Sequence, residues 1–243
     1  MAKWMRGAGG AAVVLGLLAV AGPAGATGGP VRLLATFDGC GHDRCAERVP
    51  DDSGHGHTAT VRAEPGGSLR TERHGDGLAA RLSHANLQVT GGHDFDPGER
   101  SFAFGVEVKT DAPLVEGENL FQRGTYSDTP GVDQFKLQID AGRQGCVIKG
   151  DHERVFDFAP VDLPVDGRWH SVACAVTPKT IAYVVDGKPY RVANTAGSIT
   201  FPDAENVQIG GNFSGDHNGD AVVHPIDDPF FAVGPGSLSA RPG

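Results

Sequence analysis

The sequence predicts an all-β protein, an antiparallel β-sandwich or jelly roll with about a dozen strands in two sheets. Hydrophobic and polar residues alternate with a period of two in many short runs, and turn signals separate these runs. No segment longer than about ten residues shows helical spacing. The 36 Gly and 16 Pro residues suit a turn-rich chain, and 39% hydrophobic residues can fill a core.

Two runs show the alternation most clearly. In residues 101–109 the apolar side is formed by four residues: Phe102, Phe104, Val106 and Val108. In residues 134–140 it is formed by Phe135, Leu137 and Ile139. The other expected strands are 31–38, 58–61, 68–72, 77–83, 87–90, 119–123, 146–149, 155–158, 169–176, 180–186, 206–210 and 229–233. The turn signals between strands include Asp96-Pro97-Gly98, Pro130-Gly131, Asp166-Gly167 and Asp186-Gly187.

Residues 1–26 are typical of a secretory signal peptide. Lys3 and Arg6 precede an apolar run over residues 11–21, and Ala24-Gly25-Ala26 resembles a cleavage site. The apolar run is shorter than the roughly 20 residues that a membrane-spanning helix needs. We therefore expect a secreted, extracellular protein that starts at Thr27, has no membrane span, and forms one domain over residues 27–243.

The charge of the expected mature chain excludes some partners. Without Lys3 and Arg6, 19 Lys and Arg residues stand against 30 Asp and Glu residues, a formal charge of −11 with His neutral. Such a surface repels nucleic-acid phosphates and anionic lipids, and the basic residues are scattered. We expect no nucleic-acid partner.

Four cysteines follow the expected signal peptide, and an even count in an oxidising compartment favours two disulfides. Cys40 and Cys45 share a loop that contains Gly and His, whereas Cys146 and Cys174 each lie in an expected strand. Of the three possible pairings we expect Cys40–Cys45 and Cys146–Cys174. A zinc site is the alternative, which the spacing disfavours because it lacks paired Cys-x-x-Cys knuckles.

Five segments follow the order of motifs in a known family. They are Phe37-Asp38 with Asp51-Asp52-Ser53-Gly54-His55-Gly56-His57; Asn119-Leu120-Phe121-Gln122-Arg123-Gly124 with Phe135-Lys136-Leu137-Gln138; Gly167-Arg168-Trp169-His170-Ser171-Val172-Ala173-Cys174 with Tyr183-Val184-Val185-Asp186-Gly187-Lys188; Val207-Gln208-Ile209-Gly210-Gly211; and Ile226-Asp227-Asp228. Together they resemble the laminin G-like, concanavalin A-like jelly-roll domains, over about residues 33 to 233. The resemblance implies that the strands of Cys146 and Cys174 lie side by side, which supports their pairing.

The family includes lectins, adhesion modules, calcium-binding modules, glycoside hydrolases and polysaccharide lyases, so the function has to be argued from the residues. The resemblance implies calcium at two acidic, Gly-rich places, and calcium favours carboxylates combined with loop carbonyls. The candidate ligands are Asp38, Asp51, Asp227 and Asp228. The alternative is that these carboxylates cap turns.

Two histidines depart from the family pattern. His55 and His57 stand where the family usually has Asn, and imidazole is a poor calcium ligand, so this loop would contribute backbone carbonyls. The pair could instead bind a transition metal, but the spacing names no third ligand.

Carbohydrate recognition needs exposed aromatic rings beside polar groups. Trp169 and Tyr183 lie in the family hairpin and are expected in the core. Tyr126, in a loop, is the best candidate for an exposed ring. Its expected helpers in a second loop are Asn212, Asp216, His217 and Asn218.

The enzyme alternatives find weaker support. Retaining glycosidases need two carboxylates about 5–5.5 Å apart, and no strand carries a Glu-x-Asp-x-x-Glu run. Arg70-Thr71-Glu72-Arg73 is similar to a strand of alginate lyases, but the Gln-, His- and Tyr-containing motifs of those enzymes are missing. We therefore expect a non-catalytic, calcium-stabilised module that binds extracellular carbohydrate or protein; a carbohydrate-active enzyme is the alternative.

Overall fold

A computed structural model describes residues 31–41, 45–140, 143–159, 162–201, 205–234 and 237. The expected signal peptide lies outside the described residues. Within them the chain forms sixteen strands and two short 3-10 turns, and no α-helix. The 3-10 turns are η1 (Asp38–Cys40) and η2 (Gly92–Phe95). The strands are β1 (Val31–Leu34), β2 (Arg48–Pro50), β3 (Thr58–His74), β4 (Gly77–Val89), β5 (Phe102–Lys109), β6 (Glu118–Arg123), β7 (Gln134–Asp140), β8 (Arg143–Lys149), β9 (Arg154–Phe158), β10 (Trp169–Val176), β11 (Thr180–Val185), β12 (Lys188–Ala193), β13 (Val207–Ile209), β14 (Asn212–Ser214), β15 (His217–Gly219) and β16 (Ile226–Val233).

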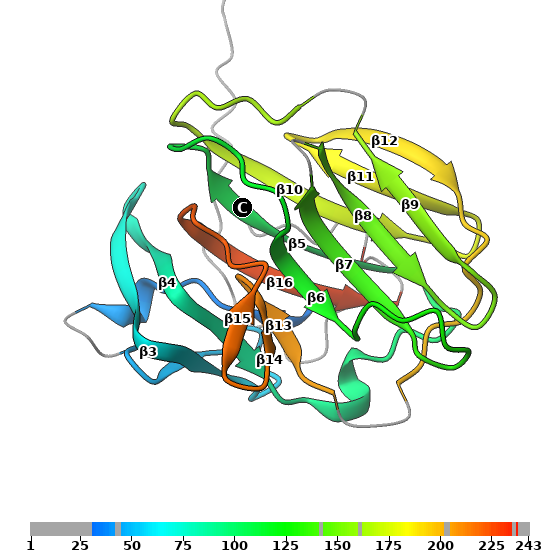
Figure 1. Cartoon of the computed structure of the whole chain (residues 1–243), viewed down its shortest axis with the longest axis horizontal. Helices are drawn as coiled ribbons and strands as arrows, with labels where there is room; N and C mark the ends of the chain where they lie inside the picture. The colour runs from blue at the N-terminus through cyan, green and yellow to red at the C-terminus, as the bar shows by residue number, and fades with distance from the viewer. Residues whose placement is uncertain are drawn as a thin grey trace, which may run out of the picture.

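The main sheet curls so that its two halves face each other (Figure 1). One half runs β12-β11-β10-β5-β16, with β1 beside β16; the other runs β4-β13-β6-β7-β8-β9, with β3 beside β4. All pairings are antiparallel, and the halves join where Ile226 of β16 pairs with Ala80 of β4. The all-β, antiparallel prediction is confirmed. The expected separation into two sheets differs from the observed topology, because this one contact keeps the main sheet continuous.

Long strands replace several short ones that the sequence suggested. The expected strands 58–61 and 68–72 belong to β3, which runs through a register shift between Ala63 and Ser68. Pro65-Gly66-Gly67 lies in that irregular stretch, where a missing N–H donor and a positive φ at Gly66 are tolerated. The strands 77–83 and 87–90 likewise belong to β4. Four short strands were not predicted: β2, β12, β14 and β15.

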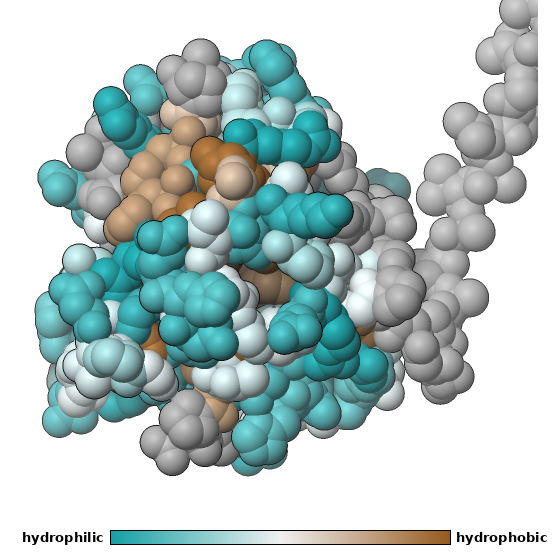
Figure 2. Space-filling view, turned by 90° about the vertical axis from the view of Figure 1, so that its right-hand side faces the viewer, coloured by the Kyte–Doolittle hydropathy of each residue, from teal (hydrophilic) through white to brown (hydrophobic). Residues whose placement is uncertain are grey.

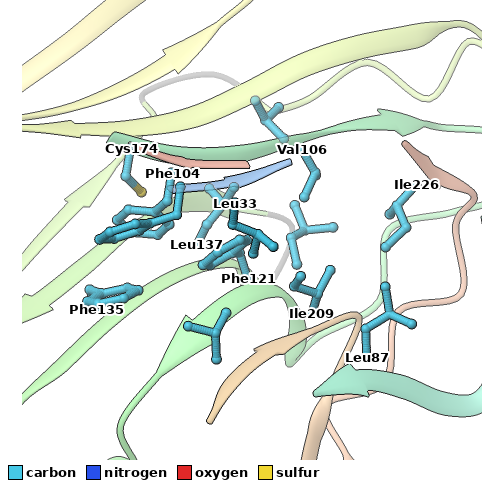
Figure 3. Close-up of a cluster of buried hydrophobic side chains, with 14 of the residues drawn as sticks. Leu33, Leu87, Phe104, Val106, Phe121, Phe135, Leu137, Cys174, Ile209 and Ile226 are labelled. Atoms are coloured by element: carbon cyan, nitrogen blue, oxygen red, sulfur yellow. The ribbon is translucent and has the colours of Figure 1, made fainter. Parts of the chain in front are cut away.

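The core fills the space between the two halves of the sheet. Phe104 of β5 packs against Phe121 of β6 and Phe135 of β7, with ring centroids 5.5 and 4.9 Å apart. Figure 3 shows these rings among aliphatic side chains from both halves, including Leu87 of β4 and Ile226 of β16. The face shown in Figure 2 is largely hydrophilic and carries a compact apolar patch.

Both expected disulfides form. Cys40 pairs with Cys45, and Cys146 of β8 pairs with Cys174 of β10. The expectation that the two strands of the second pair lie side by side is wrong, because β8 pairs with β7 and β9 while β10 pairs with β5 and β11. The Cys146–Cys174 bond therefore joins the two facing halves across the core.

Candidate binding groove and acidic cluster

Amide side chains gather on the face of β4, β13 and β6 that points away from the core. Leu87, Val207 and Phe121 point into the core, so the neighbouring positions on each strand point out. Register brings Gln88, Gln208 and Gln122 into one transverse row. We define the amide cluster as five residues: Asn86, Gln88, Asn119, Gln122 and Gln208.

Hydrogen bonds orient these amides. Asn86 Nδ2 donates to Gln208 Oε1 at 2.8 Å, and Asn119 Nδ2 donates to Gln122 Oε1 at 2.9 Å. Asn119 Nδ2 also lies 2.8 Å from Asp220 Oδ2. The amide cluster is therefore held in a fixed arrangement before any ligand arrives.

The β14–β15 hairpin lies beside β13 and forms a sheet of its own (Figure 1). Phe213 N donates to Gln208 Oε1 at 2.8 Å, and Asn218 Nδ2 donates to Ala85 O at 3.2 Å. Gly211 allows this close approach, because a Cβ there would stand 2.3 Å from Asn218 Oδ1. The hairpin is thus placed by polar contacts to β3, β4 and β13.

A groove of about 220 Å³ opens between this hairpin and the loop that follows β6. It is lined by Arg62, Gln88, Gly124, Thr125, Glu205, Asn206, Gln208 and Phe213. The Arg62 guanidinium lies 4.5 Å from the centroid of the Phe213 ring, so the two side chains form one wall. The groove combines amides, one aromatic ring and one charge of each sign.

The predicted Tyr126 lies next to Thr125 of this groove. Its side chain is 67% exposed, and Arg154 of β9 packs on the ring with its guanidinium 3.9 Å from the centroid. Arg154 is itself bound to Asp128 Oδ1 at 2.7 Å and to Ser127 O at 2.5 Å. One face of the ring is therefore supported.

The predicted helper residues are brought to the same region by the β14–β15 hairpin. Asn212 accepts a hydrogen bond from Gln208 Nε2 at 3.2 Å, and Asn218 is buried against β4. His217 and Asp216 are exposed; His217 Nδ1 lies 2.7 Å from Glu64 Oε1. Sequence reasoning missed Arg62, Phe213 and the amide cluster. The alternation of apolar and polar residues predicts that some of these side chains point away from the core. It does not predict which strands are neighbours, and the cluster depends on that.

An acidic cluster of Asp38, Glu107, Asp227 and Asp228 forms at the start of β16. Asp227 stands opposite Glu107 of β5, and Asp228 follows at a bulge with φ of 47°. His74 Nδ1 lies 2.6 Å from Asp227 Oδ2, and its ring stacks on Trp169 at 3.9 Å. Trp169, which was expected in the core, is only half-buried at the start of β10.

Burial and like charge disfavour ionisation in this cluster. Burial raises the pKa of Asp227 to about 7, with further contributions from Asp38 and Glu107, against a hydrogen bond from the Asp228 amide that lowers it. Burial likewise raises the pKa of Asp228 to about 7, and neighbouring Asp227, Glu107 and Asp38 add to the rise. Three of the four predicted calcium ligands therefore act on one another electrostatically.

Asp51 occupies a different setting. Its carboxylate accepts hydrogen bonds from Leu34 N at 3.0 Å, Ser53 N at 2.9 Å and His57 N at 3.2 Å. It thus organises the turn that begins there, as the turn-capping alternative supposed. Within the described ranges no three His, Cys, Asp or Glu side chains are arranged to hold a metal ion.

The two loop histidines contact different partners. His57 packs on Phe95 with centroids 4.8 Å apart and lies 3.4 Å from Asp94, whereas His55 lies 3.5 Å from Arg32. Their ring centroids are 6.4 Å apart. The geometry assigns them packing and polar contacts.

A second hollow, of about 270 Å³, lies among the loops near Arg100, Asp151 and His152. Arg100 Nε and Nη2 donate to the carbonyls of Pro97 and Asp96 at 3.0 and 2.6 Å. Asp151 Oδ1 accepts from Ser198 N at 2.8 Å. Because these polar groups already have protein partners, the hollow is a weaker candidate than the groove.

No family model and no curated protein matches the chain. Solved structures do resemble it. Domain 4 of AbnA, a GH43 extracellular arabinanase from Geobacillus stearothermophilus solved with arabinotriose, has a TM-score of 0.63 and 15% identity over 86% of this chain and 96% of that one. The binding domain of Paraclostridial Mosquitocidal Protein 1 has a TM-score of 0.60 and 11% identity over 84% of this chain and 49% of that one. The binding domain of Botulinum Neurotoxin DC, solved with SialylT, has a TM-score of 0.57 and 12% identity over 84% of this chain and 48% of that one.

These likenesses support an all-β, antiparallel fold of the β-sandwich kind, in which the main sheet is continuous. The chain spans about half the length of the two toxin binding domains. Among the residues that the structure describes, no helix is long and apolar enough to cross a membrane.

Proposed function

We propose that the chain is a secreted, non-catalytic module that binds extracellular carbohydrate in the groove between the β14–β15 hairpin and the Tyr126 loop. The observation that carries this proposal is that two residues of the amide cluster, Gln88 and Gln208, line the groove. Their amides offer both donors and acceptors, which sugar hydroxyls need, and the exposed ring of Tyr126 beside the groove offers a face for sugar C–H groups.

Three further observations support a secreted, non-catalytic binding role. The AbnA domain was solved in complex with arabinotriose, and the neurotoxin binding domain in complex with SialylT. Among the described lining residues the groove has one carboxylate, Glu205, whereas glycoside hydrolysis ordinarily uses two. Two disulfides fit an oxidising, extracellular compartment.

A glycan array probed with the whole chain tests the proposal. Gln88→Ala should weaken binding about tenfold, because it removes an amide that lines the groove, equivalent to about 1.4 kcal/mol. Arg191→Ala, on β12 in the other half of the sheet, is the matched control and should bind as the wild type does. If the chain binds no glycan on the array but binds an extracellular protein, the proposed carbohydrate ligand is wrong and a protein ligand takes its place.

We propose in addition that calcium stabilises the module at the acidic cluster. Carboxylate oxygens are the donors that calcium prefers, and a divalent cation would offset the mutual repulsion of Asp38, Asp227 and Asp228. Because no three of these side chains now share one ion position, binding has to draw Asp38 towards the β16 pair. Glu107 is the additional carboxylate that could join them.

Thermal unfolding with added calcium and with chelator tests this site, since a ligand of the native state raises stability. We expect a higher midpoint in millimolar calcium for the wild type and for Asp216→Asn, an exposed turn residue. Asp228→Asn should lose the shift. Equal midpoints for the wild type with calcium and with chelator would exclude the site.

A further inference from the structure

Four buried amide groups beside the groove lack a hydrogen-bond partner among the described residues. They are Asn86 Oδ1, Asn119 Oδ1, Gln122 Nε2 and Asn218 Oδ1. Each belongs to a residue that is at most 5% exposed. A buried polar group without a partner costs about 1–3 kcal/mol, so four of them on one face call for an explanation.

These groups continue the floor of the groove. Gln122 is the register neighbour of Gln208, which lines the groove, so the two side chains are about one strand spacing, roughly 4.8 Å, apart. Asn86 is bound directly to Gln208 through its Nδ2. The unpartnered groups therefore lie where a ligand chain leaving the groove would pass next.

The β14–β15 hairpin beside this floor is held mainly by polar contacts. Arg62 Nη2 donates to Gly215 O, and Asn218 N donates to Glu64 Oε1 at 2.7 Å. The hairpin has no backbone ladder to the main sheet within the described residues. To open this floor to a ligand, these side-chain contacts have to be exchanged for contacts to water or to the ligand, but no backbone ladder has to be broken.

The free groups select a chemical class. One of them, Gln122 Nε2, is a donor, and the other three, Asn86 Oδ1, Asn119 Oδ1 and Asn218 Oδ1, are acceptors. A hydroxyl group both donates and accepts, whereas a carboxylate accepts and would face the amide oxygens unfavourably. Among the described lining residues of the adjoining groove, Arg62 and Glu205 supply one charge of each sign, so the lining carries no net charge that would favour a charged ligand.

We infer that the groove continues beneath the hairpin as a subsite for one uncharged sugar unit, hydrogen-bonded by Gln122, Asn86 and Asn119. This inference rests on the carbohydrate-binding function proposed above. It narrows the ligand to a neutral oligosaccharide of three or more units.

The experiment is calorimetric titration of the whole chain with neutral arabinan, xylan and mannan fragments of two to six units and with a sialylated oligosaccharide. Gln122→Met keeps the length of the side chain and removes its amide. We expect about tenfold weaker binding of fragments of three or more units and a change below about twofold for disaccharides. Gln144→Met removes a similarly buried amide on β8 and should bind as the wild type does.

Gln122→Glu is a second variant, for the case that Gln122→Met folds poorly. Its carboxylate still accepts the hydrogen bond from Asn119 Nδ2, and an oxygen takes the place of the unpartnered Nε2 donor. Hydrogen exchange gives a second measurement. The amides of Phe213 and Asn218, which anchor the hairpin, should exchange more slowly with a trisaccharide than with a disaccharide.

The outcomes separate the two proposals. If the wild type binds a neutral fragment and Gln122→Met and Gln122→Glu bind it equally well, the subsite is wrong and the groove function stands. If the sialylated probe binds more tightly than every neutral fragment, the uncharged class is wrong. If no probe binds, the proposed carbohydrate function fails, and the subsite fails with it.

Discussion

Asp157 shows how one buried side chain links the two halves of the sheet. It lies on β9 at 2% exposure, and its Oδ2 accepts a hydrogen bond from Tyr183 N of β11 at 2.8 Å. Burial raises its pKa, against the opposing effect of that hydrogen bond. The folded protein therefore keeps the Asp157 proton to a higher pH than the unfolded chain does.

This difference in proton binding predicts a loss of stability as the pH rises from the unfolded pKa of Asp157 through its folded pKa. Asp157→Asn retains an acceptor without a charge, so its free energy of unfolding should vary less with pH than that of the wild type. Asp157→Ala should cost about 1–3 kcal/mol, because Tyr183 N loses that acceptor. Urea unfolding between pH 4 and 8 measures both effects. If the free energy of unfolding of Asp157→Asn varies with pH as steeply as that of the wild type, Asp157 is not the source of the pH dependence.

Tyr126 is the site residue that sequence reasoning found and the structure leaves exposed. Its ring is supported by Arg154 on one face, so the other can meet a sugar without reordering. Tyr126→Ala should weaken glycan binding about three- to tenfold, from loss of a stacking contact of about 0.5–1.5 kcal/mol, with little change in melting temperature. Tyr126→Phe should retain most of the affinity. Calorimetry on the whole chain measures this, and equal affinities for all three proteins would remove Tyr126 from the site.

At the scale of elements, the Cys146–Cys174 bond ties β8 to β10 across the core. The linked residues are 28 apart in sequence, against 5 for Cys40–Cys45. In the chain-entropy model the longer loop contributes about 1.5 kcal/mol more than the shorter one and about 3–4 kcal/mol in all.

Replacing both cysteines of a pair by alanine tests this order. Cys146→Ala with Cys174→Ala should lower the free energy of unfolding by about 3 kcal/mol or more, since it also leaves a gap in the core. Cys40→Ala with Cys45→Ala should lower it less. Denaturant unfolding without reductant gives both values, and the opposite ranking would show that unfolded-chain entropy does not dominate.

The strands that sequence patterns predicted well are those whose sequence alternates apolar and polar residues. β5 and β7 alternate Phe and aliphatic residues with polar ones, and their expected bounds match the structure closely. β12, β14 and β15 were missed because three to six residues with mixed burial give little periodicity. The amide cluster was missed for a different reason: it needs β4, β13 and β6 to be neighbours, and β13 is separated from β6 by more than eighty residues of sequence. Long-range pairing of this kind leaves no local signal.

At the scale of the whole molecule, closure of the sheet brings both ends of the described chain to β16. β1 pairs along β16, and η1, which follows β1, places Asp38 near Asp227 and Asp228. The first and last strands of the main sheet therefore lie side by side. Asp51, the fourth candidate calcium ligand, is held by hydrogen bonds in the turn that follows β2.

The acidic cluster at β16 predicts that two quantities change with pH in opposite directions: the stability of the calcium-free protein and the stabilisation that calcium provides. Burial raises the pKa of Asp227 and of Asp228 to about 7, above the ordinary value of 3.8, so the metal-free native state holds protons that the unfolded chain releases. Its stability therefore falls as the pH rises from about 4 towards 8. Calcium binds the ionised carboxylates, so the stabilisation it provides should grow over the same range and be largest above about pH 7. Melting temperatures measured from pH 5 to 8 in chelator and in millimolar calcium should thus diverge with rising pH.

The double variant Asp227→Asn with Asp228→Asn removes both carboxylates. Its melting temperatures in chelator and in calcium should therefore coincide, and their pH dependence in chelator should be flatter than that of the wild type. Chelator midpoints that rise with pH in the wild type would show that the carboxylates ionise normally, and the coupling between sheet closure and charge would be wrong.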